Sequence, residues 1–178
     1  MVVLIIGIPD SGKSKMAEEW AVRLSNGGRK FYIATMIPFG EEGQKRIEKH
    51  RKMRQGKGFE TIECPENLGE IVLSKEEISG STCLLECMSN LVGNEMHGER
   101  PLEGNELTDH IMKDINKLCE RAENVVIVSN SFPLEGDGYD EDTRNYVRAL
   151  MIVNEELKKI SDEVYIFEDG AWIRKERE

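Results

Sequence analysis

The chain has 178 residues, of which 39% are hydrophobic and 33% charged, a balance typical of a soluble globular protein. This length fits one domain, residues 1–178, with its own core. The formal net charge of −10 argues against general nucleic-acid binding and against attraction to an anionic membrane. No apolar run reaches the roughly 20 residues of a membrane helix. Because the apolar start is also too short for a signal peptide, we expect a cytoplasmic protein.

The cysteines are predicted to be free thiols. Their spacing along the chain matches no zinc-binding pattern, and cytosolic proteins rarely keep disulfides. We therefore expect buried, unbridged side chains at Cys64, Cys83, Cys87 and Cys119.

Short β-rich apolar runs alternate with longer helical patterns along the chain. Parallel strands are expected at 2–7, 31–35, 59–64, 82–87 and 125–129. Apolar residues at helical spacing predict helices from Met16 to Leu24, from Leu107 to Leu118 and from Tyr146 to Ile160, with a polar helix at about 41–55. The alternation predicts an α/β fold with a mostly parallel sheet and helices on both faces. Ligands bind such sheets beyond the carboxyl ends of the strands.

Two further short runs predict a hairpin at the C-terminal end. Residues 164–167 and 171–174 are strand-like, and the turn Asp169-Gly170 separates them. Two residues of this kind are typical of a tight antiparallel connection.

A complete phosphate-binding loop follows the first strand directly. The segment reads Gly7-Ile8-Pro9-Asp10-Ser11-Gly12-Lys13-Ser14, which is G-x-x-x-x-G-K-S. Its glycines let successive backbone N–H groups face one anion, and the next helix adds its positive N-terminal end. Lys13 is expected to bridge the β- and γ-phosphates, and the Ser14 hydroxyl to ligate Mg²⁺. The motif lies after an apolar strand and before an amphipathic helix, so it predicts binding of a purine nucleoside triphosphate with Mg²⁺.

Two carboxylates belong to this predicted site. Asp10 is unusual because a carboxylate inside the loop repels phosphate, so we interpret it as pointing outward; contact with a substrate hydroxyl is the alternative. Glu86 ends the apolar fourth strand, where P-loop enzymes keep an acid linked to Mg²⁺. It is expected to act on the metal directly, through a water, or as a base, and the alternative is a solvent-facing acid. Asn90 and Asn94 follow and are candidates to line the same cleft.

One strongly basic stretch contains a histidine. On a helix, Arg46, His50 and Arg54 share a face with Lys49 beside them. Such a cluster suits a polyphosphate, and the neighbouring positive charges favour the neutral, nucleophilic imidazole. The alternative is a solvated helix face that happens to hold a histidine, and spacing alone favours that alternative. Two other histidines lack such a setting and are expected at the surface, namely His97 and His110.

Together these residues resemble the bifunctional adenosylcobinamide kinase / adenosylcobinamide-phosphate guanylyltransferase family of cobalamin biosynthesis. The resemblance covers nearly the whole chain and depends on the order and spacing of its motifs. Beyond the phosphate loop they are Tyr32-Ile33-Ala34-Thr35, Glu42, Arg46-Ile47, His50, Arg54, Thr61, Glu63, Leu84-Leu85-Glu86-Cys87, Asn94, Val128-Ser129-Asn130, Arg144, Asn154 and Asp162-Glu163-Val164.

The resemblance implies a RecA-like P-loop NTPase fold, a homotrimer and two reactions. In the first, the γ-phosphate of ATP or GTP passes to the aminopropanol hydroxyl of adenosylcobinamide. In the second, a histidine attacks the α-phosphate of GTP, releases pyrophosphate and passes GMP to the phosphorylated corrinoid, giving adenosyl-GDP-cobinamide. His50 falls on the family's guanylylated histidine. The resemblance therefore favours a functional role for His50, whereas spacing alone favoured a solvated helix face.

Under this hypothesis the catalytic residues are Lys13, His50 and Glu86, and Mg²⁺ is held by Ser14 and Glu86. The nucleotide is expected to contact the loop from Gly7 to Ser14 together with Arg46, Arg54 and Glu63. Two alternatives stay open. One is a divergent P-loop kinase or NTPase without guanylyl transfer, and the other is a nucleotide-gated binding module with slow or no turnover, which Asp10 would suit.

Overall fold

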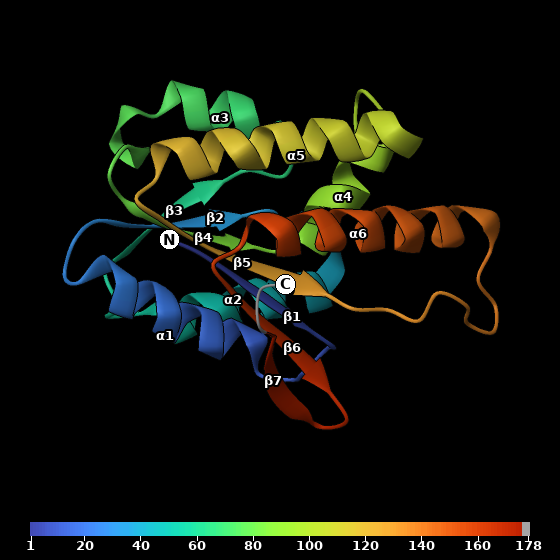
Figure 1. The fold of residues 1–178 in the computed structure, drawn as a ribbon, viewed down its shortest axis with the longest axis horizontal. Helices are drawn as coiled ribbons and strands as arrows, with labels where there is room; N and C mark the ends of the chain where they lie inside the picture. Colours follow the sequence, from blue (N-terminus) through green and yellow to red (C-terminus); the bar gives the residue numbers. More distant parts are fainter. Residues whose placement is uncertain (176–178) are drawn as a thin grey trace.

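The computed structural model describes residues 1–175, which fold around a seven-stranded sheet in the order β3-β2-β4-β5-β1-β6-β7 (Figure 1). Neighbouring strands are parallel except for β6 and β7, which are antiparallel. The strands are β1 Val2–Gly7, β2 Lys30–Ala34, β3 Phe59–Glu63, β4 Thr82–Glu86, β5 Asn124–Asn130, β6 Glu163–Glu168 and β7 Ala171–Lys175. The apolar runs therefore predicted every strand of the described sheet to within one residue at each end.

Helices cover both faces of the sheet, as predicted (Figure 1). The helices are α1 Lys13–Ser25, α2 Gly40–Arg54, α3 Leu68–Ser74, α4 Met88–His97, α5 Gly104–Arg121 and α6 Glu141–Ile160, with a 3-10 turn η1 at Glu76–Ile78. Figure 1 shows α3, α4, α5 and α6 on one face, and α1 with α2 on the other. Within residues 1–175 no helix combines the length and the apolar character needed to cross a membrane.

The sequence patterns did not predict α3 and α4. Both are short, with 7 and 10 residues, so neither repeats its apolar stripe often enough to be recognised. The first turn of α3 is held by carboxylates from distant helices. Glu95 accepts from the Asn67 N–H, and Asp114 accepts from the Gly69 N–H, each at 2.7 Å. Tertiary contacts therefore stabilise the start of α3.

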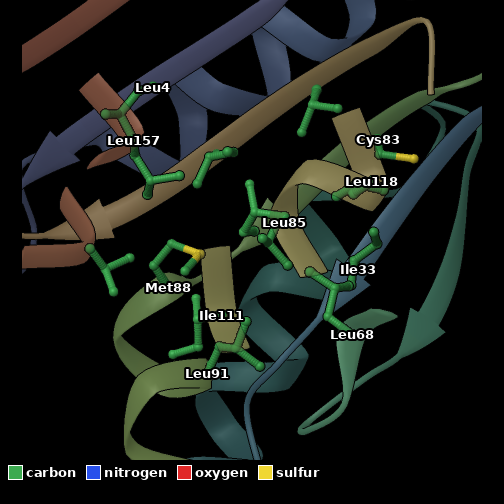
Figure 2. Close-up of a cluster of buried hydrophobic side chains, with 14 of the residues drawn as sticks. Leu4, Ile33, Leu68, Cys83, Leu85, Met88, Leu91, Ile111, Leu118 and Leu157 are labelled. Atoms are coloured by element: carbon green, nitrogen blue, oxygen red, sulfur yellow. The ribbon is translucent and has the colours of Figure 1, made fainter. Parts of the chain in front are cut away.

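Alternating residues of the central strands form two separate cores. Leu4, Ile33 and Leu85 face the layer of α3 to α6, where they meet residues such as Leu118 and Leu157 (Figure 2). Their neighbours in the strands, such as Val3, Tyr32 and Leu84, face α1. This period of two is the pattern expected of strands that are buried on both faces.

All four cysteines are free, as predicted. Cys64 and Cys83 are buried, whereas Cys87 and Cys119 are only partly buried. The expectation of four fully buried thiols was therefore wrong for two of them. Burial raises the pKa of the Cys83 thiol to about 11, which keeps it protonated and unreactive at neutral pH.

The predicted C-terminal hairpin is confirmed, and it reaches the phosphate loop. Asp169 and Gly170 both have positive φ, 49° and 80°, as a two-residue turn between twisted strands requires. Trp172 of β7 lies against the end of β1, so a Cβ atom at Gly7 would lie 3.0 Å from its ring. Only glycine allows this close approach of backbone and ring.

Candidate active site

The phosphate loop leaves β1 and becomes the first turn of α1. Gly12 has φ 85°, which a glycine adopts without strain, and Asp10 has φ 58°. The Ile8 carbonyl accepts hydrogen bonds from the Lys13 ammonium at 2.9 Å and the Ser11 hydroxyl at 2.8 Å. Burial lowers the pKa of Lys13, and the nearby Arg46 charge lowers it further. An anion bound at this helix N-terminus would relieve that electrostatic cost.

The loop forms one wall of a cavity of about 290 Å³ beyond the carboxyl ends of the strands. The cavity brings together most of the predicted site residues, from the loop, from α2 and from the ends of β3 and β4. These are Pro9, Asp10, Gly12, Lys13, Ser14, Arg46, Lys49, His50, Arg54, Glu63, Glu86 and Asn90.

Four of the predicted residues do not line this cavity. Gly7, Ile8 and Ser11 belong to the loop and shape it without lining the cavity. Asn94 was predicted to line the cleft and does not. Its side-chain amide donates instead to the carbonyls of Thr35 at 2.8 Å and Pro65 at 2.9 Å. It thereby fixes the chain where it leaves β2 and β3.

Glu86 lies at the centre of the site. Its carboxylate accepts hydrogen bonds from the Ser14 hydroxyl and from the Tyr32 hydroxyl, the latter at 3.2 Å. The residue is only 8% exposed, so it is not the solvent-facing acid of the alternative interpretation. Burial and the Glu86 charge both raise the pKa of Tyr32, so its hydroxyl stays protonated and remains a donor.

His50 points from α2 toward the same carboxylate. Its Nδ1 atom lies 3.7 Å from Glu86 Oε1, which is longer than a hydrogen bond. Nδ1 is buried, and none of the described residues is its hydrogen-bond partner. The imidazole is therefore close to Glu86 without being bonded to it, and a small shift of α2 would bring the two atoms into hydrogen-bond distance.

The basic face of α2 is confirmed, because Arg46, His50 and Arg54 all line the cavity. Arg54 is the most buried of the three, at 8% exposed, and its guanidinium lies 3.4 Å above the centre of the Tyr32 ring. This stacking holds a charge that would otherwise be costly to bury. Its buried Nη1 has no hydrogen-bond partner among residues 1–175.

Sequence reasoning gave no role to three residues that shape the site. Tyr32 holds both Glu86 and Arg54, as described above. The Thr35 hydroxyl donates to the Cys87 carbonyl at 2.8 Å and accepts from the Cys87 N–H at 2.7 Å, which fixes the chain after β4. Asn130 at the end of β5 donates to the Ser89 hydroxyl at 2.5 Å. Thr35 and Asn130 lie at strand ends, whereas Tyr32 lies in the middle of β2. The available signal was that all three belong to motifs of the family resemblance, to which no role had been given.

The two remaining histidines differ from each other. His97 is exposed, as expected, and its Nε2 lies 2.9 Å from an oxygen of Asp142. His110 is not a plain surface residue, and this corrects the prediction. Its Nε2 is buried and lies 3.6 Å from carboxylate oxygens of both Glu95 and Asp114. His110 therefore lies beside the two buried acids, from α4 and α5, that also hold the start of α3.

Comparison with solved structures supports the assignment of the fold. The ATPase domain of G40P superposes with a TM-score of 0.53 at 12% identity, over 94% of this chain and 69% of that one. The flagellar accessory protein FlaH from Methanocaldococcus jannaschii gives a TM-score of 0.51 at 14% identity, over 97% and 75%. Together with the mostly parallel sheet, they establish a RecA-like P-loop fold.

Sequence comparison identifies the family. A search of curated proteins gave no match. The family model described as cobinamide kinase / cobinamide phosphate guanyltransferase matches residues 3–174, nearly the whole chain. The family transfers phosphoryl and nucleotidyl groups and contributes to cobalamin biosynthesis, which agrees with the phosphate loop and the cavity described above. The chain therefore belongs to the cobinamide kinase / cobinamide phosphate guanyltransferase family and is a transferase.

Proposed function

We propose that the chain phosphorylates the aminopropanol hydroxyl of adenosylcobinamide and then transfers GMP from GTP to that product through His50. One observation carries the proposal. His50 lines the same cavity as Lys13 and Ser14, with its Nδ1 atom turned toward Glu86. A phosphate-binding loop and a potential nucleophile therefore face one bound nucleotide.

The first reaction uses the phosphate loop. The backbone N–H groups before α1 and the Lys13 ammonium hold the β- and γ-phosphates, and the acceptor hydroxyl attacks the γ-phosphorus as the bond to the β-phosphate breaks. Ser14 and Glu86 fit Mg²⁺, because their oxygens already contact each other and Mg²⁺ prefers oxygen ligands. Bound there, the ion would neutralise charge that develops on the phosphates.

The second reaction passes through a covalent intermediate. With Nδ1–H directed at Glu86, the Nε2 lone pair of His50 is free to attack the α-phosphorus of GTP. A P–N bond forms, the bond from the α-phosphorus to the bridging oxygen breaks, and pyrophosphate leaves. A phosphate oxygen of the phosphorylated corrinoid then attacks the same phosphorus, and the P–N bond breaks. His50 is regenerated, and Arg46 and Arg54 stabilise charge on the phosphate in both steps.

We further propose that Glu63 selects guanine. It ends the edge strand β3 and lines the cavity, and Arg51 lies 3.8 Å from its carboxylate. Guanine offers two adjacent donors, N1–H and the N2 amino group, which a carboxylate can accept together. Adenine lacks this pair of donors, so Glu63 favours GTP over ATP for the guanylyl step. The homotrimer and the cytoplasmic location stay predictions.

Covalent labelling tests the proposal. The purified chain is incubated with Mg²⁺ and GTP radiolabelled at the α-phosphate, then denatured and exposed to acid or alkali. We expect label that survives alkali and is lost in acid, as a phosphoramidate requires. The label should disappear in His50→Ala and remain in the matched control His97→Ala, whose histidine lies outside the cavity. Absence of label in the native chain, with nucleotide binding intact, would leave a P-loop kinase or a nucleotide-gated module and refute the transferase mechanism.

A further inference from the structure

A second cavity of about 150 Å³ lies next to the nucleotide cavity, and Asn130 lines both. It is covered by α6, whereas α2 covers the first cavity. The two helices lie on opposite faces of the sheet (Figure 1). Arg54 of α2 stacks on Tyr32, which belongs to the core on the α1 side. Leu150 of α6 belongs to the other core. The second cavity therefore lies on the α6 side of the sheet and adjoins the nucleotide cavity at Asn130.

The wall of this cavity is connected directly to the phosphate loop. The Ser131 N–H donates to the carbonyl of Gly7, the first residue of the loop, at 3.0 Å. Asn154 of α6 donates to the Asn130 carbonyl at 3.1 Å and accepts from the Ser129 hydroxyl at 2.6 Å. These bonds hold the second cavity at a defined position relative to the phosphate loop.

The lining is mixed, with polar atoms in the larger share, and it suits a neutral polar group with a short apolar stem. Phe132, Val147 and Met151 contribute apolar surface. The charged side chains are already paired, Lys158 with Glu155 at 2.7 Å and Glu168 with Lys175 at 2.9 Å. Asn130, which lines both cavities, also carries a buried side-chain carbonyl without a hydrogen-bond partner among the described residues. The lining thus combines neutral polar side chains with apolar ones, and the charged side chains named above are paired.

The volume indicates the size of the group. At about 30 Å³ for each water-sized unit, the cavity holds roughly five such units. A propionamide arm has about this number of heavy atoms, with an apolar stem and a neutral N–H donor at its end. Cobinamide carries carboxamide arms around its corrin ring, so the family's acceptor offers the group that the cavity fits.

We propose that the second cavity binds one carboxamide arm of cobinamide and thereby places the acceptor hydroxyl near Asn130, where this cavity adjoins the nucleotide cavity. This inference rests on the proposed kinase reaction, since it names the acceptor site of that reaction. In-line phosphoryl transfer requires the hydroxyl to lie opposite the leaving nucleoside diphosphate, so it must enter the nucleotide cavity beside the γ-phosphate, and the junction at Asn130 is the entry that this proposal assigns to it. A neighbouring copy of the chain is the other possible source of an amide, through an Asn or Gln side chain.

Substitutions that fill the cavity test the proposal. Met151→Trp and Ser131→Leu change side chains at its edge, and both residues are solvent-accessible, so the fold should tolerate them. Ile152→Trp is the matched control, because Ile152 is the next residue of α6, is 44% exposed and does not line the cavity. Equilibrium dialysis against cobinamide gives its Kd, and the kinase assay gives KM for cobinamide and for nucleotide. The labelling of His50 by GTP is measured for each variant, and sedimentation gives the oligomeric state of each variant.

We expect both filling variants to weaken cobinamide binding and raise its KM by about tenfold, the loss expected for one small buried arm. The nucleotide KM and the labelling of His50 should stay as in the control. The inference is overturned if the folded variants bind cobinamide with the Kd of the native chain. It is equally overturned if the variants change the oligomeric state and leave the Kd for cobinamide unchanged. It is also overturned if the native chain binds no cobinamide. If GTP does not label His50 in the native chain, the guanylyl mechanism is refuted. The dialysis against cobinamide would still show whether the second cavity binds the acceptor.

Discussion

Removal of the Lys57 ammonium should destabilise the chain more than its partial exposure suggests. Lys57 lies just after α2, and its Nζ atom is 2.5 Å from Glu18 Oε2 of α1. Glu18 is fully buried, at 0% exposed, whereas the Lys57 side chain keeps 35% exposure. The second oxygen of Glu18 has no hydrogen-bond partner among the described residues, so Lys57 provides the compensation for this buried charge.

The magnitude follows from this geometry. Removing one partner of a fully buried ion pair costs about 3–5 kcal/mol, because a charge stays buried without compensation. Since water reaches Lys57, we reduce the expected cost of Lys57→Met to about 2–3 kcal/mol. For a chain of this length that corresponds to a loss of roughly 4–12 °C in Tm. Lys15→Met is the matched control, since Lys15 and Glu19 form a 4.0 Å pair with side chains 75% and 65% exposed. Its cost should be about 0–1 kcal/mol.

Thermal unfolding followed by circular dichroism measures both variants. The double variant Glu18→Leu, Lys57→Met should recover most of the lost stability, because it removes the buried charge together with its partner. Because Lys57 ties the end of α2 to α1, Lys57→Met should also slow the labelling of His50, which α2 carries. A single variant no less stable than the Lys15→Met control would refute the reasoning, and so would a double variant less stable than the single one.

Four further predictions concern a surface histidine, the phosphate loop and two helical glycines. The Asp142 hydrogen bond, followed by the bond to the Gly93 carbonyl, raises the pKa of His97 above its ordinary 6.5. The protonated contact therefore stabilises the fold fully below pH 6.5 and loses its effect as the pH rises through the raised pKa, so the Tm difference between the native chain and His97→Gln should shrink at alkaline pH. Asp10→Gly should tighten nucleotide binding in calorimetry, because it removes a carboxylate from the loop, and change the free energy of unfolding by at most about 1 kcal/mol. A fall in kinase kcat without tighter binding would show instead that Asp10 contacts the acceptor hydroxyl. Gly93→Ala should raise the free energy of unfolding by about 0.5–1 kcal/mol, because the nearest atom to a new Cβ, Cε2 of Tyr146, is 3.6 Å away in an ordinary helix. Gly69→Ala should lower it, because the new Cβ would collide with the Asp114 carboxylate, and denaturant unfolding measures both changes.

The sequence by itself determined the local elements and the chemistry of the phosphate loop. Strand bounds followed from apolar runs, the hairpin from its two turn residues, and the shared face of Arg46, His50 and Arg54 from helical spacing. These features depend on residues within a few positions of one another, so backbone preference and periodicity encode them directly. The resemblance of ordered motifs then predicted the family that the comparison identifies.

Only the tertiary structure decided how these pieces meet. Glu86, Tyr32 and His50 come from β4, β2 and α2, and no local pattern places the Tyr32 hydroxyl 3.2 Å from Glu86 or His50 beside it. The start of α3 and the inward turn of His110 also depend on partners far along the chain. Strand order and helix packing result from the burial of whole faces against one another, which involves many weak contacts between distant segments. That is why the residue types of the site were readable from the sequence, while the central position of Glu86 and the second cavity were not.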